Sequence, residues 1–179
     1  MPRKWCGCRT DCRALIDVAS APSINALQSV RHPHHFLGIT QQGQSAVFRT
    51  RGNAHAHLVL RGGGGRANYD AVSIAVAERE LAAAGLPATI VVDCSHGNSN
   101  KDPSLQPLVA ENCVAQIVDG NRSIVGLMLE SHLKAGNQPI PKDLSKLEYG
   151  LSITDPCIDW QTTEDLLLKL HRSLLTVQR

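Results

Sequence analysis

Apolar runs and helix-like segments alternate along most of the chain. Apolar runs at 57–60, 89–93 and 124–129 are each followed by a segment with apolar residues at helical spacing, at 71–84, 105–118 and 163–177. Continuous β-branched runs are typical of strands buried on both faces. Strands that alternate with helices along the chain indicate a parallel sheet covered by helices. The pattern therefore predicts an α/β fold with about three βα units, and leaves open sheet and barrel as alternatives.

The ends of the predicted helices carry their own signals. Gly85 and Pro87 follow the helix expected at 71–84 and should end it. Thr162 or Thr163 is the expected N-cap of the last helix. Residues 14–30 are weakly patterned and support at most a short helix at 23–29, with Ser23 as its N-cap.

Two strand-like runs precede the first of these units. They lie at 35–40 and 45–50, with Gly43 between them. Such runs around a glycine-containing connection are typical of a β-hairpin, which we expect here.

Composition and charge narrow the function classes. The 179 residues are 42% hydrophobic and 19% charged, as expected for one soluble globular domain. A net charge of +2, with basic residues scattered along the chain, gives no reason to expect nucleic-acid binding. No apolar run approaches the roughly 20 residues that span a membrane, and residues 1–13 have no apolar signal core. We expect a cytoplasmic protein that acts on small molecules.

The cysteines fall into two groups. Three are crowded near the start and three are far apart: Cys6, Cys8, Cys12, Cys94, Cys113 and Cys157. In a reducing compartment all are most simply free thiols. The crowded group could bind zinc, but structural zinc sites use two spaced ligand pairs and no fourth ligand stands nearby.

Four polar residues follow apolar runs at the ends of predicted strands. They are Arg61, His96, Glu130 and Asp155, the last after a shorter run at 151–154. In α/β folds the carboxyl ends of strands converge on one face, where active sites form. One imidazole and two carboxylates suit a divalent ion, and an arginine beside them would bind phosphate. Taken singly, each also has an ordinary role, as a solvated loop residue or a helix cap.

Other candidate groups give weaker patterns. The glycines at 62–65 could form a mobile surface loop or bring backbone N–H groups to a phosphate. His34 and His35 point to opposite faces of a strand and are poor joint ligands, whereas His55 and His57 share a face.

Five blocks of this sequence, in order, resemble type I 3-deoxy-D-arabino-heptulosonate-7-phosphate (DAHP) synthases. The resemblance extends from about Arg31 to the end of the chain. The blocks are HFLGIT at 35–40, LRGG at 60–63 with NY at 68–69, DCSHGNSNK at 93–101, ESHL at 130–133 with GNQ at 136–138, and YGLSITD at 149–155 with Trp160.

This resemblance implies the C-terminal part of a (β/α)8 TIM barrel, about three βα units, with an inserted β-hairpin at 36–50. It implies that His96, Glu130 and Asp155 bind a divalent metal ion (Mn, Fe, Co or Zn), and that Arg61 binds the phosphate of phosphoenolpyruvate. Lys101 lies in a matching block and receives no catalytic role.

The family reaction condenses phosphoenolpyruvate with erythrose 4-phosphate in the first step of the shikimate pathway. By the same resemblance, the hairpin contributes to an aromatic amino-acid effector site and a subunit contact, so a full-length protein is expected to be a homo-oligomer. A related octulosonate-8-phosphate synthase is an alternative that fits two blocks less well.

The start of the chain departs from the family pattern. Residues 1–30 are expected to be atypical and 31–179 to form the C-terminal part of the barrel domain. The resemblance also implies a cysteine ligand, further phosphate-binding residues and a lysine-bearing strand that the chain lacks. We therefore expect little or no turnover by this chain alone, and the alternative is a non-catalytic remnant that associates with intact synthase subunits.

Overall fold

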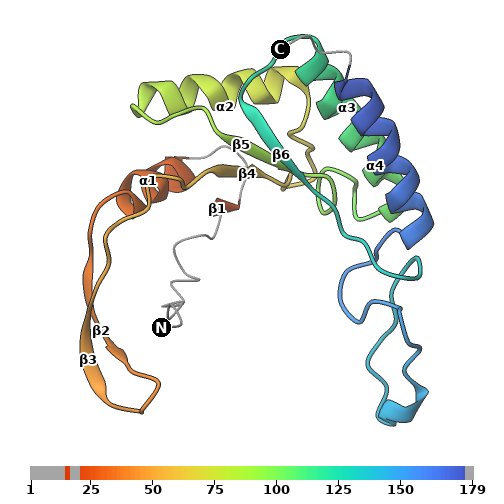
Figure 1. Ribbon diagram of the computed structural model, residues 1–179, viewed down its shortest axis with the longest axis horizontal. Helices are drawn as coiled ribbons and strands as arrows, with labels where there is room; N and C mark the ends of the chain where they lie inside the picture. The colour runs from red at the N-terminus through yellow and green to blue at the C-terminus, as the bar shows by residue number, and fades with distance from the viewer. Residues whose placement is uncertain (1–14, 17–20, 176–179) are drawn as a thin grey trace.

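A four-stranded parallel sheet forms the centre of the computed structural model, which describes residues 15–16 and 21–175. Its strands are β1 (Leu15–Ile16), β4 (Leu58–Leu60), β5 (Ile90–Asp93) and β6 (Ile124–Met128), and they lie side by side in this order (Figure 1). Each neighbouring pair is parallel, so the strands end at the same edge. The predicted α/β class is confirmed.

Helices lie along one face of this sheet (Figure 1). They are α1 (Ala21–Val30), α2 (Ala71–Ala83), α3 (Gln106–Val118) and α4 (Trp160–Leu174), and a 3-10 turn, Pro103–Leu105, leads into α3. Alternate strand residues such as Leu58, Leu60 and Val92 pack with helix residues such as Ile74 and Val109 in one buried cluster. Burial of this apolar face is the main favourable contribution to the fold.

The other face of the sheet is only partly covered. Val59 of β4 is buried, Val91 of β5 is partly exposed, and Met128 of β6, which pairs with Asp93 on this face, is 40% exposed. The expectation of burial on both faces is therefore correct for β4, holds for β5 except at the partly exposed Val91, and is wrong for β6. Within the described residues, nothing packs fully over this end of the sheet.

Two helices begin earlier than the sequence predicted. Ser23 is not an N-cap but a buried residue inside α1, because Pro22 fits the first helical turn and does not interrupt it. The N-cap of α4 is Asp159, not Thr162 or Thr163, and its carboxylate accepts a hydrogen bond from the Thr162 N–H at 2.8 Å. An acidic cap can satisfy a free N–H group and also favour the positive end of the helix dipole.

The predicted hairpin is present and points away from the sheet (Figure 1). Strands β2 (His35–Ile39) and β3 (Ser45–Arg49) pair antiparallel, and the rings of Phe36 and Phe48 stack at 5.7 Å. Most of the hairpin's large apolar side chains are exposed. The hairpin therefore adds little to the core.

Two features near the ends of the chain differ from the expected pattern. Strand β1 lies in a segment where at most a short helix was expected, and it joins the sheet beside β4. No strand forms at 151–154; this stretch bends and makes an isolated bridge between Ser152 and Asn137. None of the helices in the described ranges has both the length and the apolar character needed to cross a membrane.

Candidate metal centre

His96 lies in a tight turn directly after β5. Its backbone has a φ of 49°, and Asn100 and Lys101 in the same turn also have positive φ values. Non-glycine residues rarely adopt this conformation, and such backbones cluster at functional sites. The turn is held by the Lys101 N–H, which donates to the His96 carbonyl at 2.7 Å. The backbone therefore presents the imidazole in a fixed direction.

Asp93, the last residue of β5, faces the imidazole. Its Oδ2 lies 2.8 Å from Nδ1 of His96, although the direction of this contact is not that of a hydrogen bond. Asp93 is buried, and its Oδ1 accepts from the Ser95 N–H at 2.9 Å. A carboxylate on Nδ1 favours the tautomer in which Nδ1 carries the proton, and this leaves Nε2 free to bind a metal ion.

Glu130 follows β6 and is fixed through its backbone. The fully buried amide of Gln106 donates from Nε2 to the Glu130 carbonyl at 3.1 Å and accepts from the Glu130 N–H at 2.9 Å. The Ile158 N–H also donates to this carbonyl, at 3.0 Å. The start of α3 and the segment before α4 therefore both position Glu130.

Asp155 comes from the long connection between β6 and α4, not from a strand. Asn137 Nδ2 donates to the neighbouring Thr154 carbonyl at 2.7 Å, and Gly136 and Cys157 form a backbone bridge on the other side. The Asp155 side chain is 56% exposed. Its position depends on pairing within this connection, which returns the chain to the sheet edge.

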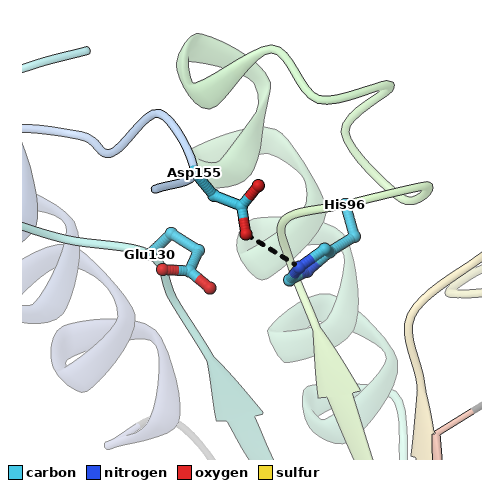
Figure 2. A group of neighbouring side chains, drawn as sticks. All are labelled: His96, Glu130 and Asp155. Carbon is cyan, nitrogen blue, oxygen red and sulfur yellow. Dashed lines mark ion pairs between the residues drawn. The ribbon is translucent and has the colours of Figure 1, made fainter. Parts of the chain in front are cut away.

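These three side chains converge on one point (Figure 2). One ligand atom from each of His96, Glu130 and Asp155 lies within 4.8 Å of the others, and Nε2 of His96 is 3.5 Å from Oδ2 of Asp155. Ligand atoms about 2.0–2.2 Å from a divalent ion lie at most about 4.4 Å apart, so a small inward movement would fit one. No other group of this kind occurs in residues 15–16 and 21–175.

Arg61 directly follows β4, as predicted. Its carbonyl accepts from the Asn98 N–H at 3.2 Å, which joins the Arg61 turn to the His96 turn. Its guanidinium makes no hydrogen bond or ion pair with any described residue, so it can pair with an anionic ligand.

The remaining sequence candidates lie outside this centre. Nε2 of His34 contacts the Ser29 carbonyl at 2.7 Å, and His35 accepts a hydrogen bond from Arg49 at 2.8 Å. Neither these two histidines nor His55 and His57 belong to a metal-ligand group in the described ranges. The crowded cysteines at positions 6, 8 and 12 lie outside the described residues.

Three buried cysteines are free thiols, as predicted: Cys94, Cys113 and Cys157. Burial raises the pKa of the Cys113 thiol to about 12 and also raises the pKa of Cys94. Both thiols therefore stay protonated near neutral pH and are poor nucleophiles.

A sequence model described as the DAHP synthetase I family matches residues 8–168. The chain belongs to the DAHP synthetase I family. The match includes residues 8–30, part of the segment expected to be atypical, and the boundary at residue 30 stays a prediction.

Members of this family are similar to the chain over most of its length. A Tyr-sensitive phospho-2-dehydro-3-deoxyheptonate aldolase from Salmonella typhimurium is 50% identical over 158 residues, which are 88% of this chain and 44% of that protein. The Tyr-sensitive protein from Escherichia coli is 49% identical with the same coverage. The structure of a phospho-2-dehydro-3-deoxyheptonate aldolase from Francisella tularensis has a TM-score of 0.83 and 37% identity, over 91% of this chain and 46% of that chain. This chain thus spans under half the length of these DAHP synthase relatives.

Sequence reasoning missed two residues that support the centre. The sequence pattern predicts Asp93 only as the end of a strand, although an acid three residues before a histidine in a turn is a local signal. Gln106 carries no local signal, because its partner Glu130 is 24 residues away. Its complete burial at a helix start becomes visible only in the fold.

Proposed function

We propose that this chain carries the metal-binding part of a DAHP synthase active site. The reaction of that enzyme condenses phosphoenolpyruvate with erythrose 4-phosphate in the first step of the shikimate pathway. The observation that carries the proposal is the convergence of His96, Glu130 and Asp155 from three separate segments, within 4.8 Å of one another. Membership of the DAHP synthetase I family supports the same reaction.

In this proposal, the three side chains bind a divalent ion (Mn, Fe, Co or Zn), because one imidazole and two carboxylates form a mixed nitrogen and oxygen ligand set. The bound ion would supply Lewis acidity toward the aldehyde oxygen of erythrose 4-phosphate. Arg61 binds the phosphate of phosphoenolpyruvate through its planar guanidinium. Because the metal ligands and Arg61 lie at one edge of the sheet, they would hold the two reactants in register.

We further propose that the sheet is part of a (β/α)8 barrel and that the hairpin is an insertion in it. Parallel strands with helices on one face and a less covered opposite face fit a barrel wall. The solved relative with a TM-score of 0.83 supports this assignment.

The proposal also covers how the full assembly is regulated and how its subunits associate. The Salmonella and Escherichia relatives are named as Tyr-sensitive, and we propose an aromatic amino acid as effector of the full assembly. A homo-oligomer and a cytoplasmic location are part of the proposal.

Metal binding by the purified chain tests the site directly. We expect Mn²⁺ to bind the wild-type chain, and His96→Ala to weaken binding at least about tenfold because a ligand is lost. His171→Ala, on the exposed face of α4, is the matched control and should bind as wild type does. Equal Mn²⁺ affinity in all three proteins would contradict the proposed centre.

Phosphoenolpyruvate binding tests the role of Arg61. Arg61→Ala should weaken phosphoenolpyruvate binding in the presence of Mn²⁺. Arg122→Ala should not, because Arg122 is exposed near the opposite end of β6.

A preference for arabinose 5-phosphate over erythrose 4-phosphate would favour the octulosonate-8-phosphate synthase alternative. The expectation of little turnover by this chain alone stays a prediction, and phosphoenolpyruvate consumption with Mn²⁺ measures it. Mixed oligomers with an intact synthase would support the remnant alternative.

A further inference from the structure

One buried amide joins the carboxyl ends of two neighbouring strands. Nδ2 of Asn98 donates to the carbonyl of Leu60, the last residue of β4, at 3.1 Å. It also donates to the carbonyl of Asp93, the last residue of β5, at 2.8 Å. Both donors of this amide are therefore used, one on the strand before Arg61 and one on the strand before His96.

The acceptor of the same amide is also used. Oδ1 of Asn98 accepts from the Asn68 N–H at 2.7 Å, and Oδ1 of Asn68 accepts from the Gly62 N–H at 2.8 Å. Asn98 and Asn68 are only 6% and 8% exposed. In low-dielectric surroundings such bonds are strong, and a carbonyl left without its donor is costly.

The two turns touch through their backbones at this place. A Cβ atom added to Gly97 would lie 2.6 Å from the carbonyl carbon of Gly62, and one added to Gly62 would lie 2.7 Å from that of Gly97. Only glycine permits this approach. The turn that carries Arg61 and the turn that carries His96 therefore form one packed unit, with Asn98 at its centre.

We propose that Asn98 is a positioning residue that holds the phosphate-binding Arg61 in register with the metal ligand His96. This inference rests on the proposed function. Asn98 touches no reactant in this account; it acts by fixing the two strand ends from which the functional side chains project. Sites held by such supporting bonds lose affinity when the support is removed, because the ligands no longer keep their geometry.

Three variants of Asn98 separate hydrogen bonding from packing. Asn98→Ala removes the amide, and Asn98→Asp keeps its size and an acceptor but replaces both donors with a carboxylate that faces two carbonyls. Asn98→Ser keeps one donor and continues the test if Asn98→Ala does not fold. We expect about tenfold weaker Mn²⁺ binding in the first two and a smaller loss in Asn98→Ser.

Asn121→Ala is the matched control. The Asn121 side chain also makes several bonds, donating to Glu78 and accepting from the Ser123 and Ile124 N–H groups, but it lies before β6, at the amino end of the sheet. We expect both Asn98→Ala and Asn121→Ala to lower the melting temperature. Only the Asn98 variants should change the visible absorption spectrum of bound Co²⁺, since this spectrum reports ligand geometry.

The outcomes separate the two claims. If the wild-type chain binds no Mn²⁺ or Co²⁺ through His96, the proposed function fails. If it binds, and folded Asn98 variants match Asn121→Ala in Mn²⁺ affinity and in the Co²⁺ spectrum, only the positioning role of Asn98 is overturned. Weaker binding with an altered spectrum in the Asn98 variants alone supports it.

Discussion

At the scale of single residues, the contact between Asp93 and His96 determines which imidazole nitrogen can bind a metal ion. Asp93→Asn keeps an oxygen for the Ser95 N–H but removes the negative charge 2.8 Å from Nδ1. The imidazole then loses its preference for a proton on Nδ1, and we expect 10- to 100-fold weaker Mn²⁺ binding, about the range for such partners. Calorimetric titration measures this, with the exposed Asp119→Asn as control. Unchanged affinity in Asp93→Asn would refute the role.

The buried thiol of Cys113 makes the unfolding free energy depend on pH. Burial raises the pKa of its thiol from 9.0 to about 12, so the folded chain keeps the proton that the unfolded chain releases. Its stabilising contribution is complete below pH 9.0 and is lost as pH rises toward 12. The difference in unfolding free energy between wild type and Cys113→Ala should therefore shrink from about pH 8 to about pH 10.5. Urea denaturation at both values measures it, and a constant difference would contradict the prediction.

At the scale of elements, α2 depends on its N-cap. Asp70 accepts from the N–H groups of Val72 and Ser73 at 3.0 and 3.1 Å and from the Ser73 hydroxyl at 2.6 Å. We expect Asp70→Ala to lower the unfolding free energy by about 1 kcal/mol near neutral pH, whereas Asp70→Asn, which keeps a capping oxygen, should lose much less. Chemical denaturation of both variants measures the difference. Equal losses would show that the cap does not act through its oxygen.

The same cap has a defined pH dependence. The Ser73 hydroxyl, and then the Ser73 and Val72 N–H groups, hold the pKa of Asp70 below its ordinary 3.8. The stabilisation is present above pH 3.8 and is lost as pH falls through the lower folded pKa. The difference in unfolding free energy between wild type and Asp70→Ala should therefore shrink as the pH falls. The difference between Asp70→Asn and Asp70→Ala should stay constant, because the asparagine does not titrate.

The elements also show what local sequence can and cannot predict. Apolar runs predicted β4, β5 and β6 because a buried parallel strand appears in the sequence as a continuous apolar run, whichever strand it pairs with. The convergence of His96 and Glu130 follows from the rule that parallel strands end at one edge. Asp155 converges for another reason, because Asn137 and neighbouring residues pair across a long connection. Strand β1 has two residues, too few for any periodicity, and exists through its pairing with β4.

At the scale of the whole molecule, apolar surface remains exposed on the hairpin. Leu37 and Val47 are paired across β2 and β3, so their side chains share a face, and they are 81% and 65% exposed. Exposed apolar side chains that gather on one face are typical of contact surfaces, whereas single exposed ones are common on any soluble protein. We therefore expect the purified chain to self-associate through this face, in line with the homo-oligomer we propose.

A charge on this face tests the expectation. Leu37→Lys and Val47→Lys should each shift sedimentation toward the monomer, because burying an unpaired ammonium in an apolar contact is unfavourable. Val72→Lys is the matched control, since Val72 is 73% exposed but lies alone on α2, away from the hairpin. If all three variants and the wild type sediment alike, the hairpin is not the contact surface. If Val72→Lys alone dissociates the protein, subunits associate through the α2 surface instead.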